Sequence, residues 1–301
     1  MRIVSFVPAA TEMACALGLE DSIVGVSREC DYPASIRTKP VVVHSALSLA
    51  TLTPNEIDRI VRQTLHETGT LYAVDEALLR TLDPELILTQ DLCQVCAPSG
   101  NDITRFLASL DRQPRIVYLS PHTLGDVDDN LRTLGDVTDR RAEADAIIVA
   151  NHARLANLEA RLAPLTERPT VFFAEWVDPL YCAGHWVPEM IERAGGIPLI
   201  ARPGSDSVRV TRDDVISARP DVIVVAPCGF SAESAADQAA TLGLPAQQVF
   251  AVDANTFFAR PGPRLVDGIE LLAHLLHPDL VPYDVANQAP NQRATGTRIS
   301  S

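Results

Sequence analysis

Short runs of β-branched and aliphatic residues alternate with amphipathic helical segments along most of this chain. Nine runs are predicted strands, at residues 3–7, 23–26, 41–43, 85–89, 115–119, 170–174, 198–200, 221–225 and 248–252. Helical patterns fill the intervals, at residues 9–18, 54–68, 76–81, 102–110, 188–194, 212–218, 232–242 and 263–276. Strands that alternate with helices in this way are typical of α/β folds with parallel sheets.

The two halves of the chain repeat one local pattern, in which a helix is followed by a proline and then a strand. The proline is Pro84 in the first half and Pro220 in the second. Between the halves lies one predicted helix, residues 124–163, on which Ile148, Leu155 and Leu162 share a face with Leu158 and Leu165. We therefore expect an α/β fold of two Rossmann-like lobes with parallel sheets, bridged by a long α-helix.

The predicted boundaries follow from this pattern. We expect a first lobe over residues 1–122, a bridging segment over 123–166 and a second lobe over 167–280. The tail from 281 to 301 is rich in Asn, Gln, Pro, Ser and Thr without periodicity, so we expect it to be disordered.

Charge and hydropathy exclude several classes of protein. The net charge of −14 at pH 7 argues against a nucleic-acid partner, because phosphate binding needs a basic surface. No apolar run approaches the ~20 residues that span a bilayer, so a membrane-spanning role is not expected. The chain begins without the basic and apolar order of a secretory signal, which predicts a cytoplasmic protein, or a periplasmic one if a leader was removed.

The chemically distinctive side chains follow the predicted strands. In an open parallel sheet, ligands bind beyond the carboxyl ends of the strands, and side chains placed there are candidates for binding. We expect a small-molecule ligand to be held by aromatic and polar side chains of these loops. The predicted ligand-binding residues are Asp91, Glu175, Trp176, Tyr181, His185, Trp186, Phe258 and Arg260.

Five of the six cysteines follow predicted strands too, which leaves a second hypothesis open. Thiolates and imidazoles are ligands for zinc, and thiolates hold iron–sulfur clusters. The candidate metal ligands are Cys30, Cys93, Cys96, Cys182, Cys228, His44 and His122. On this alternative the chain is a metal or iron–sulfur protein, with redox or desulfurising chemistry as a further step. We expect the five cysteines to line one crevice between the lobes.

Motifs of common enzyme classes are missing. The sequence has no Gly-x-Ser-x-Gly, no phosphate-binding Gly-rich loop ending in Gly-Lys-Ser or Gly-Lys-Thr, and no Gly-x-Gly-x-x-Gly after a strand. A binding protein is therefore favoured over an enzyme.

The opening Arg-Ile-Val-Ser-Phe-Val-Pro-Ala-Ala-Thr-Glu of residues 2–12 resembles the cobalamin and iron-siderophore substrate-binding proteins of ABC transporters. The resemblance extends over residues 1–278 and includes 29–33, 90–97, 120–122, 175–176 and 183–189. It implies a class III periplasmic-binding-protein-like fold, with cobalamin or a related corrinoid held between the lobes. It also implies an ABC permease as partner.

Overall fold

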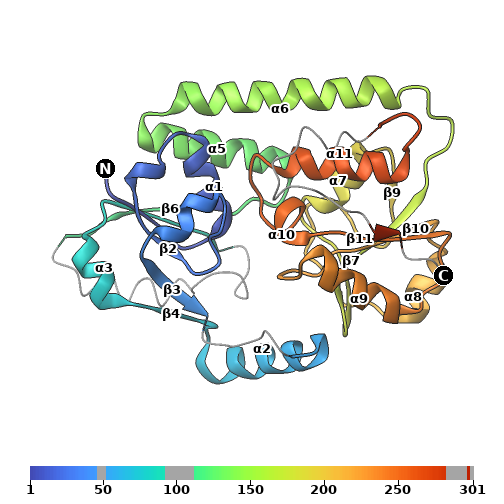
Figure 1. The fold of residues 1–301 in the computed structure, drawn as a ribbon, viewed down its shortest axis with the longest axis horizontal. Helices are drawn as coiled ribbons and strands as arrows, with labels where there is room; N and C mark the ends of the chain where they lie inside the picture. Colours follow the sequence, from blue (N-terminus) through green and yellow to red (C-terminus); the bar gives the residue numbers. More distant parts are fainter. Residues whose placement is uncertain (46–51, 92–111, 283–296, 299–301) are drawn as a thin grey trace. The chain divides into compact units, whose positions relative to one another are not determined.

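The computed structural model describes residues 1–45, 52–91, 112–282 and 297–298 (Figure 1). The chain divides into two units. Unit 1 comprises Met1–Pro121 and Asp126–Ala146, and unit 2 comprises His122–Gly125 and Ile147–Ser301. The predicted helix at 102–110 lies outside the described residues.

Unit 1 is built on a six-stranded sheet with the order β4-β3-β2-β1-β5-β6. Its parallel strands are β1 (Ile3–Ser5), β2 (Ile23–Ser27), β3 (Val41–Ser45), β5 (Leu86–Thr89) and β6 (Arg115–Tyr118). The edge strand β4 (Tyr72–Val74) pairs antiparallel with β3 and was not expected from the sequence. Three residues are too few to show a strand period, so the pattern gives no signal there.

Side-chain caps mark the start of some of the helices of unit 1. The helices of this unit are α1 (Pro8–Ala16), α2 (Pro54–Thr68), α3 (Glu76–Leu82) and most of α5 (Leu124–Thr138), with short 3₁₀ turns at Glu20–Ser22 and Ala34–Thr38. Thr53 and Glu56 form a capping box at the start of α2, and Gly69 ends it with φ 74°. The predicted bounds of α2 are confirmed.

The helical region between the two halves consists of two helices, which corrects the expectation of a single one over 124–163. Helix α5 stops at Thr138, and α6 (Arg141–Leu162) follows it. Asp139 takes a left-handed conformation with φ 57°, and the Arg140 N–H donates to the Gly135 carbonyl at 2.7 Å. The break has no Gly or Pro to reveal it. The predicted apolar stripe of α6 is confirmed in unit 2, because Ile148, Leu155, Leu158 and Leu162 are buried.

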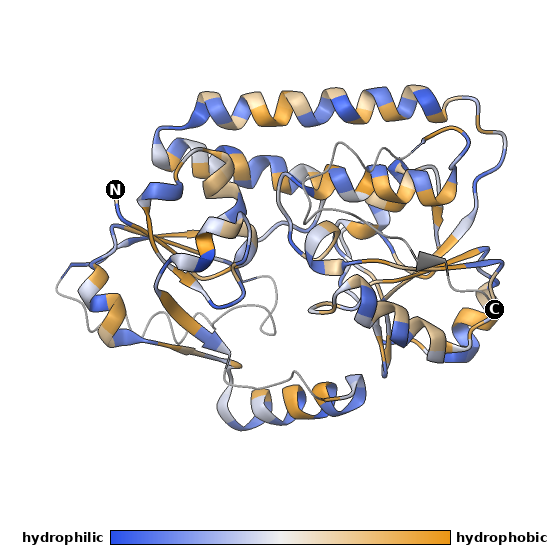
Figure 2. Cartoon of the chain, viewed as in Figure 1, coloured by the Kyte–Doolittle hydropathy of each residue, from blue (hydrophilic) through white to orange (hydrophobic). Residues whose placement is uncertain are grey.

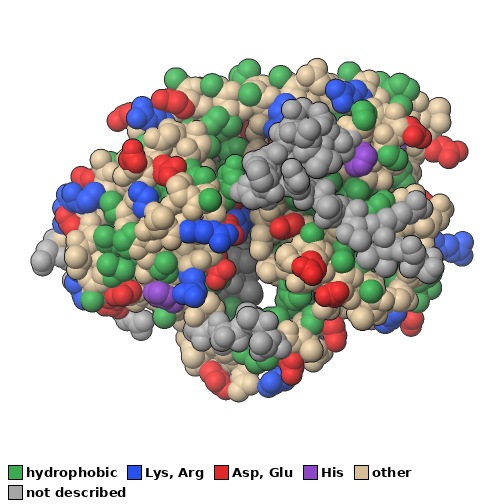
Figure 3. Space-filling model, in the orientation of Figure 1, with side chains coloured by type: hydrophobic (Ala, Val, Ile, Leu, Met, Phe, Trp, Pro, Cys, Tyr) green, Lys and Arg blue, Asp and Glu red, His purple; other side chains and the backbone are tan. Residues whose placement is uncertain are grey.

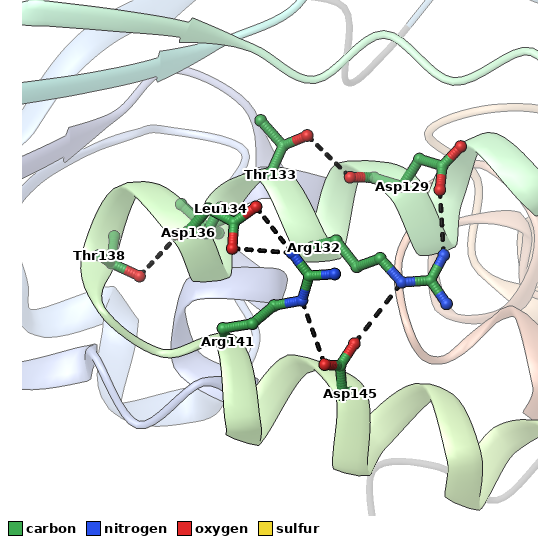
Figure 4. A network of polar contacts seen from close by, with 8 residues as sticks. All are labelled: Asp129, Arg132, Thr133, Leu134, Asp136, Thr138, Arg141 and Asp145. Atoms are coloured by element: carbon green, nitrogen blue, oxygen red, sulfur yellow. Dashed lines mark hydrogen bonds and ion pairs between the residues drawn. The ribbon is translucent and has the colours of Figure 1, made fainter.

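An ion-pair network holds the start of α6 to α5 within unit 1 (Figure 4). Arg141 donates to both carboxylate oxygens of Asp136 at 2.8 Å and to Asp145 at 3.1 Å. Asp145 also lies 3.5 Å from the guanidinium of Arg132 on α5. All four side chains are more than a third exposed, so each ion pair contributes little to stability by itself.

Unit 2 contains a second sheet with the order β12-β11-β10-β7-β8, and β9 pairs with β7. Its strands are β7 (Thr170–Val177), β8 (Leu180–Cys182), β9 (Ile197–Pro198), β10 (Val222–Val225), β11 (Gln248–Ala251) and β12 (Thr297–Arg298). Strands β9, β7, β10 and β11 are parallel, whereas β8 and β12 pair antiparallel at the two sides. Strand β12 falls within the predicted disordered tail.

The helices of unit 2 follow the predicted pattern closely. They are α7 (Val187–Arg193), α8 (Arg212–Ala218), α9 (Ala232–Leu242), the short α10 (Ala254–Phe257) and α11 (Leu265–Leu276). In Figure 2 the strands carry mostly hydrophobic residues, and the helices alternate between hydrophobic and hydrophilic faces. The core of unit 2 includes Phe172, Ile223 and Val215, all fully buried.

The repeated helix-proline-strand pattern has the same backbone conformation in both units. Helix α3 ends at Asp83 with φ 42°, and Pro84 then leads into β5. Helix α8 ends at Arg219 with φ 51°, and Pro220 leads into β10. A left-handed residue ends each helix, and the proline prevents its continuation.

Acidic and basic side chains are interspersed on the molecular face drawn in Figure 3. Within the described residues, no helix combines the length and the apolar character that are needed to cross a lipid bilayer.

Candidate functional site

Two segments of unit 2 pack against each other without room for a side chain between them. The first, residues 183–186, joins β8 to α7, and the second is residues 204–207. A Cβ atom on Gly184 would lie 2.3 Å from the Ser207 nitrogen and 2.6 Å from the Ser205 carbonyl oxygen. The His185 N–H donates to the Ser205 carbonyl at 2.6 Å, and the Gly204 N–H donates to the His185 carbonyl at 2.9 Å. Glycine at 184 is therefore what allows this close approach.

These segments bring together His122, His185 and Asp206. The possible ligand atoms of the three side chains all lie within 4.8 Å of one another. His185 Nε2 is 3.3 Å from Asp206 Oδ1, and the centroids of the two imidazole rings are 5.7 Å apart. His122 belongs to unit 2, and two residues after it the Leu124 N–H donates to Glu189 Oε2 at 3.0 Å.

The electrostatics of this group favour a neutral imidazole at His185. Burial lowers the pKa of His185, and the nearby His122 lowers it further, whereas Asp206 raises it. A neutral imidazole has a lone pair with which it can accept a hydrogen bond or bind a metal.

A protonatable carboxyl lies beside this group. The Ser207 hydroxyl donates to Glu175 Oε2 at 2.7 Å. Burial raises the pKa of Glu175, and hydrogen bonds from Ser207 and the Gly184 backbone oppose that rise only in part. Glu175 can thus present a neutral carboxyl, which both donates and accepts hydrogen bonds.

Aromatic side chains lie at the carboxyl ends of the parallel strands of the unit 2 sheet. Trp176 on β7 and Phe230 after β10 make an edge-to-face pair, with centroids 5.6 Å apart and planes at 83°. The Trp176 indole N–H donates to the Asp178 carbonyl at 3.1 Å, and Tyr181 lies opposite Trp176 on β8. All three rings are partly exposed.

Two other predicted ligand-binding aromatics are buried in unit 2. Trp186 is 6% exposed, and its indole N–H donates to the Phe258 carbonyl at 2.7 Å. Phe258 is 2% exposed and packs edge-on against Phe173, with centroids 5.1 Å apart. Both rings therefore belong to buried residues of unit 2 and offer little exposed surface to a ligand. Arg260, in the following segment, is partly buried.

The predicted site residues of unit 1 lie near the carboxyl ends of its strands. Asp91 follows β5; its N–H donates to the Ser120 hydroxyl oxygen at 2.9 Å, and that hydroxyl lies 3.2 Å from Asp91 Oδ1. His44 is inside β3 and partly buried. Cys30 is buried, with its Sγ 3.0 Å from Thr11 Oγ1.

The described cysteines occupy separate environments. The sequence places Cys182 in a loop, which is wrong, because it lies in β8 within the core of unit 2 and is 1% exposed. Cys228 is exposed after β10, and Cys30 belongs to unit 1. Cys93 and Cys96 lie outside the described residues. Among the described His, Cys, Asp and Glu side chains, the group of three that could share a metal ion contains no cysteine.

Sequence reasoning missed Asp206, Ser207 and Phe230. Asp206 and Ser207 belong to a polar loop, Gly204-Ser205-Asp206-Ser207, which by composition is ordinary. Only its tertiary contact with Gly184 places it beside His185. Phe230 follows β10, so the search for side chains just after predicted strands could have found it, but that search selected Cys228 instead.

Comparison with known proteins gives a consistent relationship. A family model described as "Periplasmic binding protein" matches residues 107–248. The vitamin B12-binding protein of Vibrio cholerae is 28% identical in an alignment 287 residues long, which covers 89% of this chain and 86% of that protein.

Two solved structures have the same fold. The heme-binding protein RhuT from Roseiflexus sp. RS-1 superposes with a TM-score of 0.69 at 19% identity, covering 93% of this chain and 99% of that one. The vitamin B12-binding protein BtuF of Vibrio cholerae gives 0.63 at 24% identity, covering 91% and 96%. The predicted α/β fold with parallel sheets is confirmed, and over residues 107–248 this chain is similar to periplasmic binding proteins.

Proposed function

We propose that this protein binds a corrinoid, such as cobalamin, and delivers it to an ABC permease. The observation that carries the proposal is the 28% identity to a vitamin B12-binding protein, which extends over 89% of this chain. A similarity of that extent includes both units rather than one shared motif.

The side chains of unit 2 suit a large, flat ligand with a polar rim. Trp176, Tyr181 and Phe230, together called the aromatic wall, offer partly exposed rings on which an apolar macrocycle face can pack. Glu175 offers a carboxyl that can pair with the amide groups of a corrin periphery. An apolar wall with few polar groups is the usual composition of a small-molecule site.

Further polar side chains complete the proposed site. Arg260, which follows α10 in unit 2, is proposed to meet amide or phosphate groups of the ligand. Asp91, which follows β5, is proposed as a ligand-binding residue of unit 1. Trp186 and Phe258 are proposed to keep the wall rigid from behind, since both are buried. His185 is proposed to border the wall, beside Trp186.

Calorimetric titration of the purified protein with cyanocobalamin and hydroxocobalamin tests the proposal, with hemin as a second ligand. We expect heat and a shift of the corrin absorption bands with either cobalamin. Trp176→Ala and Phe230→Ala should each weaken binding by about tenfold or more, because each removes a ring from the wall. The control Val149→Ala alters a 68% exposed residue of α6 and should bind as the wild type does.

Two results would overturn the proposal. Absence of heat and of spectral change at high micromolar cobalamin would exclude a corrinoid carrier. Binding of hemin alone would reassign the protein to another tetrapyrrole while leaving its solute-binding role intact.

A further inference from the structure

We propose that His122, His185 and Asp206 of unit 2 form a binding site for a divalent transition-metal ion, with zinc as the best match. Two imidazoles and one carboxylate are a ligand set that suits Zn²⁺, and Co²⁺ or Ni²⁺ can replace it. This inference goes beyond the proposed solute and does not depend on it.

The distances are close to those of a bound ion. In a tetrahedral site with bonds of 2.0–2.2 Å, neighbouring ligand atoms lie about 3.4 Å apart. His185 Nε2 and Asp206 Oδ1 are already 3.3 Å apart. No pair of ligand atoms in the group exceeds 4.8 Å, so binding requires His122 to approach the other two by up to about 1.4 Å.

The backbone fixes two of the three ligands before any ion binds. His185 exchanges two hydrogen bonds with residues 204 and 205, so its segment and that of Asp206 are held as one piece. At Gly184 the two segments lie so close that even one methyl group would not fit between them. Pre-organised ligands lower the entropy cost of binding.

The third ligand is positioned to adjust. His122 is exposed, and it precedes the anchored Leu124, whose N–H is held by Glu189 of α7. Only Thr123 separates the exposed His122 from the anchored Leu124, and the small movement that metal binding requires is within the rotation of one side chain. Three protein ligands leave a fourth position for water or for a donor group of another molecule.

Cobalt and zinc titrations test this site without any corrinoid. The full chain, freed of metal with a chelator, is titrated with Co²⁺ and followed by absorbance, and the Zn²⁺ affinity is measured by competition. We expect visible cobalt bands of four-coordinate intensity, displaced by one equivalent of Zn²⁺. Thiolate-to-cobalt charge-transfer bands in the near ultraviolet should be absent, because no cysteine takes part.

Three variants assign the ligands. His122→Ala and Asp206→Asn change exposed side chains. His185→Asn introduces asparagine, which tolerates the φ of 54° at this position. Each should weaken Zn²⁺ binding by about 100-fold or more, because even outer-shell partners cost 10–100-fold. His152→Ala, an exposed histidine of α6, is the control and should leave the affinity unchanged.

Any of three results would overturn the proposal. The first is no binding of Zn²⁺ or Co²⁺ by the folded wild type. The second is binding that all three variants retain. The third is a cobalt spectrum dominated by thiolate bands, which would place the ion at cysteines instead.

Discussion

The Ser207 hydroxyl donates a 2.7 Å hydrogen bond to Glu175 Oε2, which joins β7 to the loop that carries Asp206. The carboxyl of Glu175 is buried, and this burial raises its pKa. The pair therefore couples the stability of the site to pH.

Glu175→Gln should remove that coupling. The native pKa of Glu175 lies above the ordinary value of 4.5, so its neutral form is favoured in the folded state. Its contribution to stability is complete below pH 4.5 and is lost as pH rises through the native pKa. Glutamine stays neutral at every pH, and its side-chain oxygen still accepts the hydrogen bond from the Ser207 hydroxyl. Urea unfolding from pH 4 to 8 should show the variant gaining on the wild type as pH rises; a constant difference would contradict the assignment.

Gly184→Ala should lower the free energy of unfolding by about 1–3 kcal/mol, the usual cost of overpacking. The new methyl group would have to displace the backbone of residues 205–207. Chemical denaturation checks the value, and Gly125→Ala is the matched control. The nearest atom to a Cβ at Gly125 is 3.7 Å away, so stability there should be unchanged or higher by up to about 1 kcal/mol. Equal effects at both positions would refute the packing argument.

Arg219→Gly should raise stability by about 0.5–1 kcal/mol, because glycine relieves the left-handed strain but loses more chain entropy. The equivalent Asp83→Gly should gain less. Asp83 also forms a 2.6 Å ion pair with Arg2, an exposed contact worth about 0–1 kcal/mol. Thermal melts of the two variants side by side test the comparison. A larger gain in stability for Asp83→Gly than for Arg219→Gly would contradict the prediction.

Arg154→Ala should destabilise unit 2 by about 1–2 kcal/mol after allowance for solvent screening. The guanidinium joins α6 to α11 through bonds of 3.0 and 2.6 Å to Glu270 and 2.7 Å to Asp267. Arg154→Lys should recover only part of the loss, since an ammonium lacks the planar fork.

The control for this position is Arg193→Ala. Arg193 makes a single ion pair with Glu159, and both side chains are largely exposed. Its removal should cost less than about 0.5 kcal/mol. Equal losses in the free energy of unfolding for Arg154→Ala and Arg193→Ala would show that the planar guanidinium of Arg154 makes no special contribution.

The elements of the fold were largely predictable because they depend on local patterns. Apolar periodicity and caps such as Thr53 and Gly69 predict where α2 begins and ends, and they do so without knowledge of the rest of the chain. Strand β8 was predictable in principle, since Asp178-Pro179 separates two apolar runs as a turn does. The break at Asp139 was not, because its side chain is compatible with a helix interior.

The candidate site was less predictable because it depends on contacts between distant segments. The search for side chains just after predicted strands selected Glu175, Trp176 and His185. It also selected Cys182, because the sequence pattern does not reveal that this residue is buried in β8. His122, His185 and Asp206 are far apart in sequence. Nothing in the residues around Asp206 distinguishes that loop until the backbone contact at Gly184 is known.

The differing burial of the cysteines makes the thiols unequal as chemical handles. Cys30 and Cys182 are shielded from reagents, and burial raises the pKa of the Cys15 thiol to about 12, so little of it is the reactive thiolate. Cys228, in contrast, is exposed two residues before Phe230. Of these four positions, a maleimide dye should attach to Cys228, where its fluorescence would report directly on the aromatic wall.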